Sequence, residues 1–175
     1  MLRSILIFGA IAGLISVSPF VYLILTNGSA HSGSVVVGYL TMLVAFSLIF
    51  VAVKRHRDRN LGGVIKFLPA LGIGLGISLV AGIVYVAVWD IYLNISHFAF
   101  VDEYAPVIVK GALAKGATPA EAARQAAEFK TTYMNPLARW PWTLVEILPV
   151  GVLVSLVTAG LLRFRQFLPA RGIAA

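Results

Sequence analysis

The sequence contains no cysteine, and charged residues make up only 12% of its 175 positions. Without a thiol the chain has no disulfide, no thiolate nucleophile and no cysteine-ligated zinc or iron–sulfur site, so several enzyme classes are excluded. Histidine is also scarce: His31, His56 and His97 lie far apart and show no HExxH spacing. A meeting of His31 and His97 with Asp102 or Glu103 is conceivable, but solvated loop histidines are the simpler interpretation. We therefore expect no metal ion and no cofactor.

Acidic residues are few as well: the chain has 7 Asp and Glu and 14 Lys and Arg, which gives a net charge of +7. In a soluble protein this balance would suggest a nucleic-acid partner, but such a partner needs an extended basic surface. Here the basic residues cluster beside long apolar segments. We expect them to orient the chain and to contact anionic lipid headgroups. No nucleic-acid partner is expected.

Hydrophobic residues dominate what is present: they form 59% of the chain, and the mean hydropathy of +0.92 is far above that of ordinary soluble domains. Four apolar runs, at about 4–26, 34–53, 68–93 and 142–162, each approach or exceed the roughly 20 residues that cross a bilayer as a helix. The first run is too long for a signal-peptide core of about 7 to 15 residues, so we expect it to be retained. The sequence predicts one all-α membrane domain over residues 1–175, an integral four-helix bundle.

A cluster of basic residues between the second and third runs predicts the orientation of the bundle. Its members are Lys54, Arg55, Arg57, Arg59 and Lys66. The connection after the first run, near residues 27–33, has no Lys or Arg. By the positive-inside rule the basic loop is cytoplasmic, and both chain termini then lie on that side. The basic residues near the termini agree with this orientation: Arg3, Arg163, Arg165 and Arg171.

The third and fourth runs are joined by a long polar connection, at about 94–141, which the same topology places outside. Thr118 followed by Glu121 is typical of a helix N-terminal capping box, and the pair at 135–136, Asn-Pro, indicates a helix end. The stretch before Thr118, at about residues 98–116, also has the character of a helix. We therefore expect an external helical hairpin, with an apolar face on the membrane surface or on the ends of the bundle.

Paired glycines indicate where helices approach each other. Gly9 and Gly13 in the first run, and Gly72 and Gly76 in the third, have the spacing that allows close contact between transmembrane helices. This contact is either internal packing or self-association, and the sequence leaves both open. The GIGLG run at 72–76 is not a nucleotide-binding loop, because no strand precedes it.

Two acids lie close to the predicted outer ends of spans. Asp90 is about one helical turn from the end of the third run, and Glu146 is a few residues inside the fourth. Arg139 precedes the fourth run and could pair with either acid. We interpret these three residues as an anchoring cluster, with an ion, proton or ligand role as alternatives. Catalytic residues are not predicted, because no substrate pocket or catalytic spacing accompanies the acids.

Four stretches together carry a family resemblance: GYLTMLVAFSLIFVAVKRHRDRNLGG, LVAGIVYVAVWDIY, FKTTYMNPLARW and EILPVGVLVSLVTAGLL. From about residue 38 to residue 162 the chain resembles the DUF4199 family of small bacterial four-span membrane proteins. The resemblance implies a multi-pass protein of the bacterial inner membrane. It implies no activity, cofactor or catalytic residue.

These observations favour a non-enzymatic membrane protein that works as an assembly or accessory component, in contact with the bilayer and with a second copy or another membrane protein. The alternative is a small ion- or proton-coupled transporter that uses the acids near the outer interface. A membrane enzyme acting on a lipid-linked substrate through Asp90, Glu146 and Arg139 is the third hypothesis.

Overall fold

The computed structural model describes residues 1–27 and 34–170, and this part of the chain is helical with no strand. Its helices are α1 (Leu2–Asn27), α2 (Val35–Asn60), α3 (Phe67–Ile95), α4 (Ala99–Ala114), α5 (Pro119–Met134) and α6 (Pro136–Leu162). Four of them, α1, α2, α3 and α6, are long and apolar enough to cross a membrane. The prediction of an all-α membrane protein with four spans is confirmed. Most of the connection near 27–33, including His31, and the terminal Arg171 lie outside the described residues.

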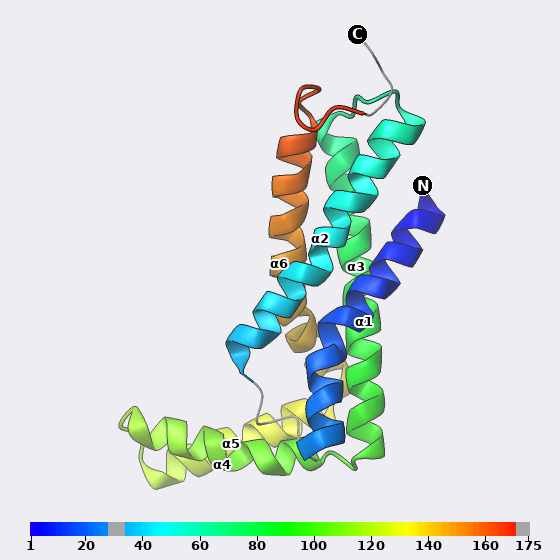
Figure 1. Cartoon of the computed structure of the whole chain (residues 1–175). Coiled ribbons are helices and arrows are strands. Elements are labelled where there is room, and N and C mark those ends of the chain that lie inside the picture. Colours follow the sequence, from blue (N-terminus) through cyan, green and yellow to red (C-terminus); the bar gives the residue numbers. More distant parts are fainter. Residues whose placement is uncertain (28–33, 171–175) are drawn as a thin grey trace.

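The four long helices run side by side, and α4 and α5 form a hairpin that crosses one end of this bundle (Figure 1). The hairpin lies at a steep angle to the bundle and projects well beyond it on one side. The N-terminus of α1, the end of α2 and the end of α6 lie at the opposite end. We call these two ends the hairpin end and the basic end.

The helix α2 extends through most of the predicted basic loop. Lys and Arg are good helix formers, and no glycine or proline interrupts the chain between Gly38 and Gly62. Gly62 and Gly63 then adopt positive φ angles of 61° and 85°, and the backbone N–H of Gly63 donates to the carbonyl of Arg57 over 3.0 Å. Left-handed residues after the last turn are a common way to end a helix. The true connection to α3 is therefore shorter than the sequence predicts.

The helix α6 begins at Pro136, before the start of the fourth predicted span. Asn135 caps it, because the side-chain oxygen of Asn135 accepts a hydrogen bond from the N–H of Leu137 over 3.0 Å. Pro136 at the first helical position needs no N–H partner. Pro141 and Pro149 lie inside the helix.

The predicted hairpin is present, and its second helix begins as the sequence indicates. Thr118 and Glu121 form a reciprocal capping box at the start of α5. The two helices of the hairpin are held together by an ion pair between Lys130 and Asp102, at 2.8 Å, and by ring contacts such as Tyr104 with Phe129, whose centroids are 5.5 Å apart.

A bend in α1 is visible in Figure 1, and the sequence offers a cause. Pro19 has no N–H to give to the carbonyl of Ile15, four residues earlier. The hydroxyl of Ser18 donates to that carbonyl instead, over 2.7 Å. Proline in a membrane helix is tolerated when a nearby serine satisfies the freed carbonyl in this way.

The helix α1 packs closely on α3 through two glycines. A Cβ atom added at Gly9 would lie 2.6 Å from the Cβ of Val80, and one added at Gly13 would lie 2.7 Å from the carbonyl oxygen of Ala81. Both distances are far below normal contact, so these positions need glycine. They serve packing within the chain.

The two glycines singled out on α3 behave differently. A Cβ at Gly76 would meet Ile5 of α1 at 3.2 Å, whereas a Cβ at Gly72 would meet no atom within 4 Å. Gly72 therefore supports no close helix contact among the described residues. A glycine of α3 that the sequence did not single out, Gly74, does face a tightly packed neighbour.

Gly74 belongs to a reciprocal contact between α3 and α6. A Cβ at Gly74 would lie 2.6 Å from the hydroxyl of Ser155, and a Cβ at Gly151 would lie 2.5 Å from the hydroxyl of Ser78. Each helix thus presents a glycine and, four residues later, a serine to its antiparallel neighbour. Small residues at this spacing let membrane helices approach closely.

Candidate functional site

At the hairpin end, Arg139 of α6 pairs with Asp90 of α3. The Nε of Arg139 donates to Oδ1 of Asp90 over 2.9 Å, and Nη2 of Arg139 donates to the same oxygen. The indole N–H of Trp140 donates to Oδ1 as well, over 3.1 Å, and the amide of Asn94 donates to Oδ2 over 3.3 Å. We call these four residues the outer polar cluster. Of the two acids that the sequence offered to Arg139, the structure pairs it with Asp90.

The guanidinium of Arg139 also reaches the end of α5. Its Nη1 donates to the carbonyls of Tyr133 and Met134, each over 3.3 Å, where a helix C-terminus carries partial negative charge. Its charged carbon lies 5.3 Å from the ring centre of Phe98. The Arg139 side chain is only 3% exposed. One side chain therefore ties α3, α5 and α6 together.

Beside the outer polar cluster, an aromatic cluster continues from the bundle into the hairpin. The indole N–H of Trp89 donates to the hydroxyl of Tyr133 over 3.1 Å, and the Trp89 ring meets Phe20 of α1 and Phe100 of α4 at centroid distances of 5.6 and 5.0 Å. Burial raises the pKa of Tyr133 to about 12; the Trp89 hydrogen bond lowers it and the charge of Glu146 raises it. Trp89 itself is buried.

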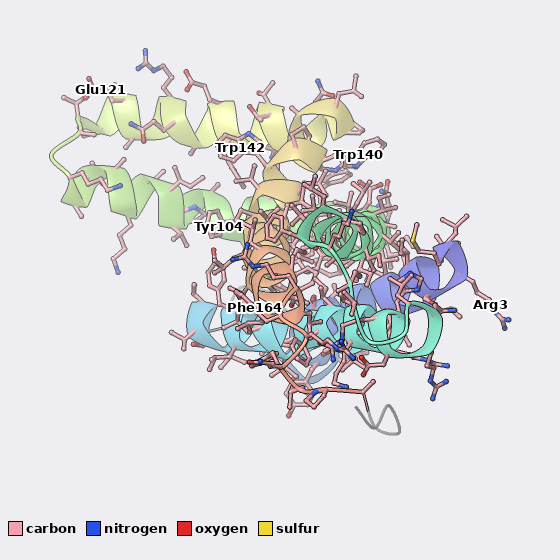
Figure 2. All side chains as sticks on the ribbon, turned by 90° about the horizontal axis from the view of Figure 1, so that it is seen from above. Arg3, Tyr104, Glu121, Trp140, Trp142 and Phe164 are labelled. Atoms are coloured by element: carbon pink, nitrogen blue, oxygen red, sulfur yellow. The ribbon has the colours of Figure 1, made fainter. Side chains whose placement is uncertain are left out.

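The two other tryptophans lie where α6 leaves the hairpin. Figure 2 shows Trp140 and Trp142 at this junction, and Glu121 at the far tip of the hairpin. Trp142 is exposed, as expected of an indole at a membrane boundary. Trp140 combines that position with its hydrogen bond to Asp90.

Glu146 lies apart from the outer polar cluster. Among the described residues it forms no hydrogen bond or ion pair, and it lines a pocket of about 430 Å³ between α1, α2, α3 and α6. Asp90 and Arg139 are not in the lining. The structure therefore does not join the three residues that the sequence grouped; it divides them into a closed ion pair and a separate acid.

At the basic end, Arg57 is fully buried although it belongs to the basic cluster. Its guanidinium donates to the carbonyl of Phe167 over 3.0 Å and to that of Leu168 over 2.5 Å, and its Nε donates to Asp58 over 2.7 Å. Lys54 also pairs with Asp58. Arg57 therefore holds the segment after α6 against the end of α2, and it is not free to contact lipid headgroups. A buried role for one arginine was not predicted.

Three other members of the basic cluster lie on the surface. Arg55, Arg59 and Lys66 are exposed, as are Arg3 and the arginines after α6, Arg163 and Arg165. Figure 2 shows Arg3 pointing away from the bundle. Several like charges thus lie exposed at one end of the protein.

Metal chemistry finds no support in the described part of the chain, where no group of three or more His, Asp and Glu side chains is placed to bind an ion. His31 lies outside it.

Four apolar spans, a hairpin across one end and exposed basic residues at the other define a small multi-pass helical membrane protein. The chain belongs to the DUF4199 family, which is described as a family of proteins of unknown function and whose model matches residues 7–163. This match confirms the resemblance carried by the sequence. Neither the curated proteins nor the solved structures gave a significant match.

Proposed function

We propose that this protein is a non-enzymatic component of the bacterial inner membrane that assists the assembly or action of a partner, with both termini in the cytoplasm. The observation that carries the proposal is the closed outer polar cluster, which fixes a projecting hairpin to the bundle. A rigid hairpin that extends beside the spans offers a surface to a neighbouring membrane protein or to a second copy of the chain.

The closure of the cluster argues against acid–base chemistry at Asp90. Its Oδ1 accepts hydrogen bonds from Arg139 and Trp140, and its Oδ2 accepts one from Asn94. A catalytic or ion-binding carboxylate needs a free oxygen for its substrate. A carboxylate that accepts hydrogen bonds from three side chains on two helices is better suited to holding helices in place.

The exposed basic residues support the proposed orientation. Arg3, Arg55, Arg59 and Lys66 are exposed, and Lys and Arg near span ends are retained on the cytoplasmic side. The same residues are suited to attract anionic headgroups of the inner leaflet, at about 1 kcal/mol for each charge near the surface. The hairpin then faces the periplasm.

Site-specific photo-crosslinking in intact cells tests the role of the hairpin. A photoreactive residue is placed at Leu113 on α4, which is 44% exposed, and for comparison at Val64 near the basic end, which is 49% exposed. We expect a discrete protein adduct from position 113 only. The adduct should disappear when Arg139→Gln frees the hairpin, and its mass distinguishes a second copy from another protein. Equal adducts from both positions, or solute movement by the purified protein alone in liposomes, would contradict the proposal.

A small ion- or proton-coupled transporter is the second candidate, and the position of Glu146 favours it. An acid at a membrane-embedded pocket, without a partner among the described residues, is suited to carry a proton or bind a cation. The test is proton or cation flux into liposomes that contain the purified protein. Transport predicts flux that Glu146→Gln abolishes and that Glu103→Gln, at an exposed acid of α4, leaves intact; an accessory component predicts no flux from any of the three proteins.

A further inference from the structure

The pocket beside Glu146 has an unusual lining for a gap between membrane helices. Of the described residues, four aromatic ones border it, Phe20 and Tyr22 from α1, Tyr39 from α2 and Tyr85 from α3, and Glu146 of α6 is the one that supplies a carboxyl group. Among the residues that the structure describes, no Lys, Arg or His is part of the lining. The rest is mostly aliphatic. Its volume of about 430 Å³ lies in the range of about 300 to 1,000 Å³ that is usual for small-molecule sites.

The inner wall of the pocket is closely packed and its rim is exposed. Tyr85 is only 2% exposed, and the Phe20 ring meets it edge to face, with centroids 6.2 Å apart and planes at 77°. Phe20 is held from behind by Trp89, at 5.6 Å. Tyr22 and Tyr39, by contrast, are 67% and 48% exposed. A ligand can therefore enter past two tyrosines and meet a preformed aromatic wall.

The charge of the pocket is not neutralised by the described residues. Arg139, the nearest cation along α6, is committed to Asp90 and to the end of α5. Glu146 has no hydrogen bond or ion pair in the part of the chain that the structure describes. A carboxylate in apolar surroundings is costly unless a cation or a hydrogen-bond donor accompanies it.

The aromatic rings of the pocket also favour a cationic ligand. The faces of Tyr and Phe rings attract cations, and groups of such rings are a recurrent means of binding quaternary ammonium groups. An anionic ligand would be repelled by Glu146, and a neutral alkyl chain would use neither the acid nor the ring faces. The carboxyl group and the four rings thus favour one chemical class of ligand.

We propose that this pocket binds the ammonium group of an amphiphilic amine, with the ammonium at Glu146 and the alkyl part along aliphatic residues such as Leu23, Val35 and Met42. Two sources supply this chemistry: the headgroup of an aminolipid of the bilayer, and a free lipophilic amine that enters from it. Binding of such an amine does not require transport, so this proposal is compatible with an accessory protein and with a transporter alike.

Titration of the purified protein in a non-ionic maltoside detergent tests the proposal, with Trp fluorescence as the readout because Trp89 packs on the pocket residue Phe20. The probes share one chain: dodecyltrimethylammonium, dodecanol and dodecyl sulfate. We expect saturable binding of the ammonium probe only. Glu146→Gln should weaken it about tenfold, whereas Glu103→Gln, which removes the same charge from an exposed site on α4, should leave it unchanged.

A second variant keeps the test decisive if Glu146→Gln does not fold. Tyr39→Leu removes a ring from the accessible rim and should weaken binding of the ammonium probe about two- to fivefold. Equal binding of dodecanol and the ammonium probe would overturn the proposal, and so would an affinity that neither substitution changes.

Lipid nanodiscs separate the two sources of the ligand. If the headgroup of an aminolipid is the natural occupant, the ammonium probe should bind more weakly in phosphatidylethanolamine nanodiscs than in phosphatidylglycerol nanodiscs, because the lipid competes for the pocket. If a free amine is the occupant, Glu146-dependent binding should be present in both. Absence of Glu146-dependent binding in both bilayers would contradict the site itself.

Discussion

The hydroxyl oxygens of Ser78 on α3 and Ser155 on α6 lie 3.4 Å apart at the buried centre of the bundle. Each hydroxyl also bonds to the carbonyl four residues before it, that of Gly74 over 2.9 Å and that of Gly151 over 2.7 Å. The serines are thus satisfied within their own helices, and the glycines leave room for them. This arrangement sets the distance between the two helices at the core of the protein.

The first prediction concerns Gly74. Gly74→Ala places a methyl group 2.6 Å from the Ser155 hydroxyl and 2.8 Å from its Cβ, so the helices must separate. We expect a loss of about 1 to 3 kcal/mol in the free energy of unfolding, as for other overpacked cores. Denaturant titration of the protein in detergent measures this loss.

Gly72→Ala is the matched control for that prediction, because a Cβ at Gly72 meets no atom within 4 Å. The same substitution, half a helical turn away, should be neutral or should stabilise the protein by about 0.5 to 1 kcal/mol through better helix propensity. If the two variants were equally destabilised, the close contact at Gly74 would not be the cause.

The second prediction concerns the outer polar cluster. Arg139→Gln removes the ion pair to Asp90 and weakens the link to α5, and we expect a cost of about 1.5 to 3 kcal/mol because the hydrogen bonds are to a charged group. Hydrogen exchange should rise at the end of α5 and in the first turns of α6. Asp90→Asn combined with Arg139→Gln should cost less than the sum of the single changes.

Lys130→Gln provides the comparison for the outer polar cluster. Lys130 pairs with Asp102 in the same hairpin, but the two side chains are 50% and 66% exposed. Exposed pairs contribute less than about 1 kcal/mol. If Lys130→Gln loosened the hairpin as much as Arg139→Gln, the burial of the Arg139 pair would have no special role.

The parts of this structure that the sequence predicts are those that depend on neighbouring residues. The spans follow from apolar length, and the start of α5 follows from Thr118 and Glu121, three positions apart. The choice between Gly72 and Gly74 is different, because two positions on a helix face nearly opposite directions and only the location of α6 decides which is packed. In both helices the sequence does show a glycine followed four residues later by a serine. Without the fold, however, nothing indicates that the two glycine–serine pairs contact each other.

Arg57 is a second case in which the local sequence could not predict the packing of a residue. In sequence it is one of several basic residues beside a span, and nothing local separates it from Arg55. Its burial depends on the carbonyls of Phe167 and Leu168, more than 100 positions later. Likewise, the sequence grouped Asp90, Arg139 and Glu146 by their expected depth, but their pairing depends on side-chain directions that depth does not determine.

The third prediction tests whether Arg57 holds the segment after α6 against the end of α2. Arg57→Met keeps much of the side-chain volume but removes the hydrogen bonds to Phe167 and Leu168 and the pair with Asp58. We expect a loss of about 2 to 3 kcal/mol in the free energy of unfolding and faster proteolysis of residues 163–170. Arg55→Met, which removes an exposed charge from the same turn of helix, should change neither quantity by a measurable amount. Equal proteolysis of both variants would show that charge near the membrane, and not the buried contact, protects the segment.

The fourth prediction concerns pH and the capping box of α5. The backbone N–H of Thr118 donates to Oε2 of Glu121 over 2.8 Å, the Thr118 hydroxyl donates to the same oxygen, and both hydrogen bonds hold the pKa of Glu121 below its usual value of about 4.3. Because the folded pKa is the lower one, the ionised carboxylate stabilises the helix start above the unfolded pKa. That contribution is lost as the pH falls through the folded pKa.

Acid should therefore loosen the tip of the hairpin below about pH 4 while the bundle remains folded. NMR titration of the Glu121 carboxyl carbon and of the Thr118 and Glu121 amides measures this, and the three signals should titrate together. Glu121→Gln keeps an acceptor for the Thr118 N–H but cannot titrate, so its Thr118 amide should show no such transition. A Thr118 amide that titrates equally in this variant would mean that another group, and not the capping box, responds to acid at the hairpin tip.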